Sequence, residues 1–275
     1  MWKLNSFDKQ MTKQQDSDLL ELIGENFKSR FLLGTAGYSS PKILLNSITN
    51  SCTEIITLGL KRQIIYEQNK NNVWIDAVKS SGCKILPNTA GCRTAKEAVV
   101  LAQMSRELFE TNWVKLEVIG DEYTQQPDCF ELLDATSQLS KKGFNVFAFC
   151  TEDIIVAKRL MNEGCKILMP WGSPIGSGQG LKNFENLIRM REKFPNVKLI
   201  IDAGIGAPSH AAYSMELGFD AVLLNSAVSQ SLDPENMATA FKHAICAGRR
   251  AFKSGLIKPQ SFATASTIIG EQHFD

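Results

Sequence analysis

The sequence lacks an excess of charge of either sign, and it lacks any long hydrophobic run. Its 275 residues include 30 basic and 29 acidic side chains, which gives a formal net charge of +1. Without surplus positive charge there is no bulk electrostatic attraction to nucleic acids or to membrane surfaces. No apolar stretch approaches the roughly 20 residues that a membrane-spanning helix needs. We therefore expect neither nucleic acid nor a membrane as a partner.

Paired cysteines and clustered histidines are also missing. The chain has seven cysteines, an odd number, and none are spaced as Cys-x-x-Cys. A disulfide framework or a thiolate zinc site is therefore not expected. The three histidines fall in segments with a helical pattern or near the C-terminus. We expect no metal site. The thiols should be reduced and mostly buried, as in a cytosol-like compartment.

Residues 1–20 have neither the apolar core nor the small-residue cleavage site of a secretory signal. Asp8, Asp16 and Asp18 are unlike the acidic-poor composition of transit peptides. We expect a polar N-terminal extension over residues 1–20 and one domain over 21–275, a length that suits a single large fold. The expected location is the cytoplasm, or the plastid stroma if the chain is plastid-encoded.

Eight short apolar runs rich in Ile, Leu and Val recur along the chain, with helical patterns between them. Near-continuous apolar runs are typical of strands buried on both faces of a parallel sheet. Strands that alternate with helices eight times predict a closed (β/α)8 TIM barrel. An open doubly wound sheet is the alternative, weakened because no G-x-G-x-x-G follows the first run. The runs are 31–36, 54–60, 84–90, 113–120, 145–150, 166–171, 198–204 and 221–226.

The fourth run carries two charged residues. In VKLEV (114–118), strand alternation places Lys115 and Glu117 on one face and the apolar residues on the other. The apolar face of a barrel strand packs against helices, so the charged pair should point inward. We expect burial to lower the pKa of the lysine, and a desolvated amine can attack a carbonyl to form an imine. The alternative is an ion pair that only fixes register, but interior ion pairs stabilise weakly.

Polar and glycine-rich segments follow other strands, at the end of the barrel where active sites lie. Asp202 ends the seventh run, where a general acid or base would lie, although it could instead cap a turn. GSPIGSGQG (172–180), Gly204 and the pair Asn225-Ser226 follow runs six, seven and eight. Their backbone N–H groups can approach an anion closely. Their convergence predicts a phosphate site.

A further polar segment, PNTAGC (87–92), follows the third run. Asn88 could donate a hydrogen bond to a substrate. Cys92 could be a nucleophile, but no histidine lies in a comparable position to activate it. Because free cysteines are often simply buried, we expect Cys92 to be a packing residue.

These segments match a known family. The chain resembles thiazole synthase of bacteria and plastids, which builds the thiazole phosphate of thiamin. The resemblance extends from about Gly24 to the C-terminal region and is specific, because several long motifs occur in the same order. The motifs are LLGTAGY, LPNTAGCRTAKEAV, VKLEVIGD, MPWGSPIGSGQG, DAGIGAPSHAAYSMELG and AVLLNSAV.

The resemblance implies a set of roles. Lys115 is expected to form an imine with 1-deoxy-D-xylulose 5-phosphate, with Glu117 and Asp202 as an acid/base pair. Sulfur is expected from the C-terminal thiocarboxylate of a ubiquitin-like sulfur-carrier protein, and carbon and nitrogen from dehydroglycine (iminoacetate). No metal or organic cofactor is implied, and a homo-oligomer is expected. The implied substrate-binding positions are Gly176, Ala203, Gly204, Asn225 and Ser226.

The sequence departs from the family in places. Ser226 stands where the family usually has Thr, and FCTED (149–153) replaces a more usual YTNDD. Because Phe149 and Cys150 differ from that pattern, it stays open whether the fifth run (145–150) contacts the substrate. Two other functions also stay open: a different Schiff-base, phosphate-binding barrel such as a class I aldolase, and a non-catalytic scaffold that docks a carrier protein.

Overall fold

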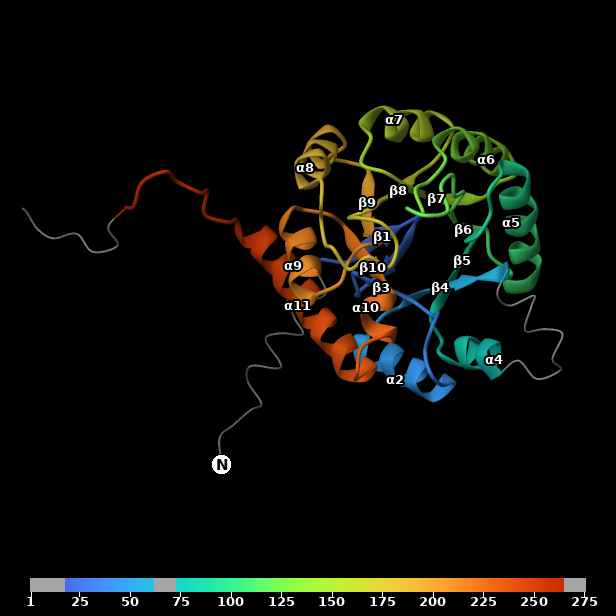
Figure 1. Cartoon of the computed structure of the whole chain (residues 1–275), viewed down its shortest axis with the longest axis horizontal. Helices are drawn as coiled ribbons and strands as arrows, with labels where there is room; N and C mark the ends of the chain where they lie inside the picture. Colours follow the sequence, from blue (N-terminus) through green and yellow to red (C-terminus); the bar gives the residue numbers. More distant parts are fainter. Residues whose placement is uncertain (1–17, 62–72, 265–275) are drawn as a thin grey trace, which may run out of the picture.

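The centre of the molecule is a closed barrel of eight parallel strands surrounded by helices (Figure 1). The computed structural model describes residues 18–61 and 73–264. Around the barrel the strand order is β10-β3-β4-β5-β6-β7-β8-β9, so neighbouring strands are consecutive and β10 closes on β3. This confirms the predicted (β/α)8 barrel. The strands are β3 (Phe31–Gly34), β4 (Ile55–Gly59), β5 (Lys84–Asn88), β6 (Trp113–Leu116), β7 (Asn145–Cys150), β8 (Ile167–Pro170), β9 (Lys198–Asp202) and β10 (Ala221–Leu224).

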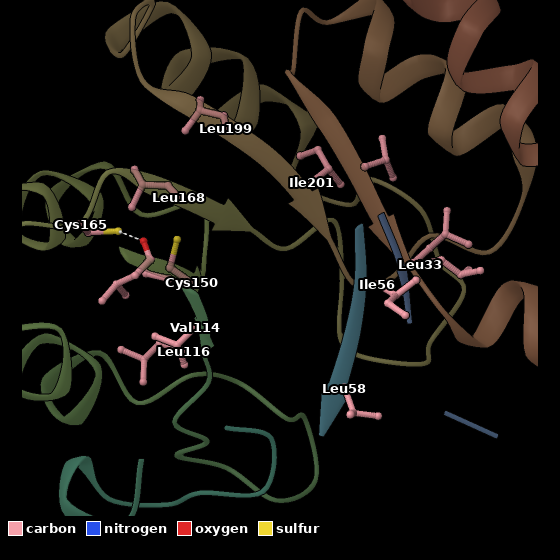
Figure 2. Close-up of a cluster of buried hydrophobic side chains, with 14 of the residues drawn as sticks. Leu33, Ile56, Leu58, Val114, Leu116, Cys150, Cys165, Leu168, Leu199 and Ile201 are labelled. Carbon is pink, nitrogen blue, oxygen red and sulfur yellow. Dashed lines mark hydrogen bonds between the residues drawn. The ribbon is translucent and has the colours of Figure 1, made fainter. Parts of the chain in front are cut away.

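The apolar runs form strands because both faces are buried. Alternate residues such as Leu32 and Ile55 point into the barrel and pack in an inner cluster. Their neighbours Leu33 and Ile56 point outward into a larger cluster between the sheet and the helices (Figure 2). Hydrophobic burial on both faces, at about 25 cal/mol per Å² of apolar surface, is the main force that holds the barrel closed.

The helices begin where the sequence supplies capping residues. The side chains of Thr94, Asp128 and Asp153 each accept a hydrogen bond from a backbone N–H of the first helical turn. Within the described ranges, no helix is long and apolar enough to span a membrane. The helices are α2 (Pro41–Ser51), α4 (Val73–Ser80), α5 (Ala95–Phe109), α6 (Cys129–Lys141), α7 (Ile154–Asn162), α8 (Phe184–Lys193), α9 (Pro208–Glu216), α10 (Ser226–Ser229) and α11 (Pro234–Ser254).

A short antiparallel hairpin, β1 (Leu20–Leu22) and β2 (Glu25–Phe27), closes the end of the barrel where the strands begin. Leu20, Leu22 and Phe27 belong to the inner cluster, and the Phe27 ring lies 6.0 Å from that of Trp113, the first residue of β6. The interior of the barrel is therefore filled by apolar side chains at this end. Residues 1–17 of the predicted N-terminal extension lie outside the described residues.

An ion cluster fastens this end of the barrel to the last long helix. Arg249 of α11 donates to both carboxylate oxygens of Asp18, at 2.8 Å each, and Arg30 Nη2 donates to the same carboxylate at 3.1 Å. Although burial opposes it, hydrogen bonding from Arg249 and the charge of Arg30 lower the pKa of Asp18 to about 2. The cluster therefore keeps its charges at neutral pH.

We expect Gly248→Ala to destabilise the fold although alanine favours helices. A Cβ atom at Gly248 would lie 2.2 Å from the carbonyl oxygen of Ala212 in α9, so α11 would have to move away. The higher helix propensity of alanine should add about 1 kcal/mol to the free energy of unfolding, whereas overpacking typically costs 1–3 kcal/mol. Chemical denaturation should show a net loss of unfolding free energy.

The neighbouring exposed position Ala247 is the control for this measurement. Ala247→Gly should cost about 1 kcal/mol through helix propensity alone. An increase in the free energy of unfolding for Gly248→Ala would contradict this, because it would show that α9 and α11 can move apart at the contact without strain.

Candidate active site

Lys115 lies inside the barrel on β6, on the face opposite to Val114 and Leu116, which pack among the helices. Its ammonium nitrogen is 2.8 Å from Oε1 of Glu117 and 2.6 Å from Oδ2 of Asp202. All three side chains are buried, with at most 6% of each exposed. The predicted inward orientation of Lys115 and Glu117 is therefore confirmed, and β9 adds Asp202 as a second carboxylate.

The electrostatics of this cluster differ from the sequence expectation. Burial alone would lower the pKa of Lys115, but the charges of Asp202 and Glu117 outweigh it and hold that pKa above the ordinary value. The expected lowering was wrong because it counted burial without the second carboxylate. Burial, helped by the negative charge of Glu117, raises the pKa of Asp202 to about 6 although Lys115 opposes the shift. Two carboxylates thus compete for one cation.

Glu117 lies just after the end of β6, and Thr89 holds its backbone in place. The Thr89 hydroxyl donates to the carbonyl of Glu117 at 2.7 Å and accepts from its N–H at 2.8 Å. The backbone N–H of Thr89 also donates to the Lys115 carbonyl, at 3.1 Å. A single buried hydroxyl therefore continues the β5–β6 pairing where the strand stops. Sequence reasoning missed Thr89, because a threonine after a strand carries no signal of its own.

Phe149 forms the wall beside the ammonium group. Its buried ring lies 5.5 Å from Lys115 Nζ, measured to the ring centroid, within cation–π range. Cys150, the other residue of β7 that differs from the family pattern, points outward among the apolar side chains (Figure 2). Phe149 therefore contacts the site directly, whereas Cys150 contributes only to packing.

The chain turns sharply after Asp202. Ala203 and Gly204 have φ angles of +65° and +75°, in the left-handed region. A Cβ atom at Gly204 would lie 1.9 Å from Oγ of Ser173, so only glycine fits against the loop after β8. Strain of about 1 kcal/mol or more at Ala203 is the cost of aiming this turn at the cavity.

The glycine-rich loop after β8 packs directly on the loop after β9. The Gly180 N–H donates to the Gly204 carbonyl at 2.8 Å. A Cβ atom at Gly206 would lie 2.3 Å from the Gly178 carbonyl oxygen. The two loops can lie this close only because both lack side chains at the contact, and together they form one wall of the cavity.

A cavity of about 570 Å³ opens at the end of the barrel where the strands finish. Its base holds Lys115, and its walls come from the loops after β8, β9 and β10. The structure brings all the predicted site residues together here. The cavity is lined by Lys115, Glu117, Asp202, Gly176, Ala203, Gly204, Asn225 and Ser226, with Asn88 also present.

Cys92 lies apart from this chemistry. It is fully buried, and burial raises the pKa of its thiol to about 11, so it stays protonated at neutral pH. Its N–H closes a turn onto the Thr89 carbonyl at 3.1 Å. The expectation of a packing residue is confirmed. All seven cysteines are free thiols, and no three His, Cys, Asp or Glu side chains among the described residues are placed to hold a metal ion.

Comparisons with known proteins agree with this architecture. The family model described as "Thiazole biosynthesis protein ThiG" matches residues 21–268. A thiazole synthase of Coxiella burnetii is 52% identical over 249 residues, which cover 90% of this chain and 95% of the relative. A thiazole synthase of Rhizobium rhizogenes is 51% identical over 257 residues, with 93% and 100% covered.

A solved structure of the Amycolatopsis orientalis BexX/CysO complex superposes with a TM-score of 0.77. It is 25% identical in sequence, and the match covers 89% of this chain and 98% of that one. The sequence matches extend across the barrel and every loop that lines the cavity. This chain therefore belongs to the ThiG family of thiazole synthases, the enzymes that make the thiazole of thiamin.

Proposed function

We propose that this enzyme condenses 1-deoxy-D-xylulose 5-phosphate with dehydroglycine and with sulfur from a carrier-protein thiocarboxylate, and that Lys115 holds the sugar as an imine. The observation that carries the proposal is a buried lysine within 2.8 Å of two carboxylates at the base of an open cavity. The matched family and its relatives support the product, a thiazole. The geometry of Lys115 and its two carboxylates supports an imine as an intermediate on the way to that product.

The amine must lose a proton before it can attack. In the resting cluster Lys115 is an ammonium ion, and Asp202, with a pKa near 6, is the carboxylate nearer to its proton, at 2.6 Å. Transfer of that proton gives a neutral amine beside a neutral carboxylic acid. The amine adds to the ketone of the sugar, and Asp202 returns its proton to the departing hydroxyl as water leaves. An imine on Lys115 remains.

The imine then makes proton removal from the adjacent carbon easier. A carboxylate at the base of the cavity can take that proton, so the carbonyl moves along the sugar chain. The carrier's thiocarboxylate sulfur adds to the new carbonyl, and hydrolysis of its bond to the carrier's carbonyl carbon leaves the sulfur on the sugar and releases the carrier as a carboxylate. Loss of water then leads toward the ring. Glu117, fixed through its backbone by Thr89, is the second base available to this cavity.

The phosphate group is assigned to the wall formed by the loops after β8, β9 and β10. Gly176, Gly204 and Ser226 line this wall. Backbone N–H groups near glycine can approach an anion without steric hindrance. Holding the phosphate here leaves the carbon chain of the sugar free to reach Lys115 at the base of the same cavity.

The carrier protein is assigned to the open end of the barrel, because its terminal thiocarboxylate must reach the carbon chain held on Lys115. The opposite end is closed by the β1–β2 hairpin. The solved complex of the relative BexX with CysO supports a protein partner for this fold. A class I aldolase would share the lysine, but it would form product without sulfur.

Reduction with borohydride in the presence of the sugar phosphate should add one substrate mass to the peptide that contains Lys115. Lys115→Arg keeps the positive charge but cannot form an imine, so the adduct should disappear in mass spectrometry. Lys198→Arg, at the start of β9 and away from the cavity, is the matched control and should keep the adduct. An undiminished adduct in Lys115→Arg would assign the imine to another lysine.

Asp202→Asn should reduce thiazole formation by about 10²–10⁴-fold while the imine can still be trapped, because Glu117 remains to accept the lysine proton. In the unaltered enzyme the rate should fall as the pH drops through about 6, where Asp202 becomes protonated and can no longer take that proton. Stopped assays from pH 5 to 8 test both points. A normal product yield from Asp202→Asn would leave this residue as a turn cap only.

Ser226→Asp should raise KM for the sugar phosphate more than tenfold, because a carboxylate would face the phosphate at close range. Asp suits the first turn of a helix, so α10 should still form. Ser226→Asn, of equal size and without charge, is the control and should change KM little. Equal KM values for the two variants would place the phosphate away from this wall.

A further inference from the structure

His210 lies behind the wall to which the phosphate is assigned, in the first turn of α9. Its side chain does not line the cavity, whereas Gly178 in the loop after β8 and Gly206 in the loop after β9 do. The proposed steps on Lys115 do not use this histidine. Its contacts nevertheless join both loops to one helix.

One ring nitrogen of His210 holds the loop after β9. Nδ1 accepts hydrogen bonds from the backbone N–H groups of Gly206 and Ala207, at 3.2 Å each. A nitrogen that accepts carries no proton, so the proton of the neutral ring lies on Nε2. A side chain in the third helical position that accepts from the residue before the helix is half of a capping box. Here it also fixes the backbone of Gly206, which lines the cavity.

The same ring supports the loop after β8. A Cβ atom at Gly180 would lie 3.0 Å from Cγ, Cδ2 and Nε2 of His210, so the ring packs against this position and leaves little room for a side chain there. The N–H of Gly180 donates to the Gly204 carbonyl at 2.8 Å. His210 therefore contacts both loops beside the place where they contact each other.

Helix α9, which carries His210, is itself fixed in the fold. Ala211 and Met215 are fully buried in the cluster between the sheet and the helices. On the outer side, Gly248 of α11 lies so close that a Cβ atom there would be 2.2 Å from the Ala212 carbonyl oxygen. Loops are in general more mobile than the elements they join. His210 thus ties two glycine-rich loops to a rigid part of the molecule.

We propose that His210 is a positioning residue for the phosphate of the sugar, because it holds the two loops whose backbone forms the phosphate wall. The inference rests on the proposed function, which assigns the phosphate to this wall. Backbone N–H groups hold an anion well only when they are already aimed at it. A residue that merely capped α9 would change the stability of the fold and leave the affinity for phosphate as it is.

The test compares His210→Ala with His210→Gln in the full chain. Initial rates of thiazole formation are measured against the sugar phosphate, with the carrier thiocarboxylate and the imino acid, supplied as glyoxylate with ammonium, both saturating. His210→Ala should raise KM for the sugar phosphate about tenfold, the effect of losing one hydrogen bond to a charged group. The inhibition constant of inorganic phosphate should rise by the same factor. Because the cluster of Lys115 is not touched, kcat should stay within about threefold of its original value.

His210→Gln should bring KM back close to its original value, because a glutamine in the third helical position can accept from the residue before the helix. His243→Ala, at an exposed histidine of α11 that does not line the cavity, is the matched control. Thermal unfolding and borohydride trapping of Lys115 report an intact fold and an intact imine site. If His210→Ala does not fold, His210→Phe replaces it, since phenylalanine keeps a ring beside Gly180 and lacks the acceptor.

The outcomes separate this inference from the proposed function. An unchanged KM for the sugar phosphate in His210→Ala, with the adduct on Lys115 still formed, would overturn the positioning role and leave His210 as a helix cap. An equal rise in KM for His210→Gln would also overturn it, because the acceptor would then not be the cause. Absence of an adduct in the unaltered chain would instead overturn the proposed function.

Discussion

The buried contact of Lys115 with Glu117 and Asp202 is the constraint on which the site depends. A cation in an apolar barrel is stable only when carboxylates pair with it, and here two carboxylates do so within 2.8 Å. Burial, together with the negative charge of Glu117, then raises the pKa of Asp202 to about 6 although Lys115 opposes the shift. The arrangement that makes the lysine tolerable therefore also provides an acid/base group that titrates near neutral pH.

The rest of the barrel keeps this cluster at the base of the cavity. Apolar side chains of the β1–β2 hairpin fill the opposite end, and the ion cluster of Asp18 with Arg30 and Arg249 fastens that end to α11. At the open end, glycines allow the loops after β8 and β9 to touch each other. At this open end the turn after Asp202 carries strained backbone at Ala203, where barrel enzymes place their active sites.

The open end of the barrel combines two kinds of wall in one cavity. The charged cluster of Lys115, Glu117 and Asp202 lies at the base, and the glycine-rich loops after β8 and β9 lie beside it. Asn225 also lines this cavity, and it occupies that position because Gly34 has no side chain.

Strand periodicity and family motifs are local properties, so they were enough to predict the alternation of strands and helices, the inward face of Lys115 and Glu117, and the segments that line the cavity. Features that depend on closure of the barrel could be seen only in the folded chain. Closure brings Asp202 of β9 to Lys115 of β6 and reverses the expected direction of the lysine pKa shift. It also gives Thr89 its role in holding Glu117, and it turns Phe149 toward the ammonium group. Such contacts join residues far apart in the chain, and no local pattern encodes their distances.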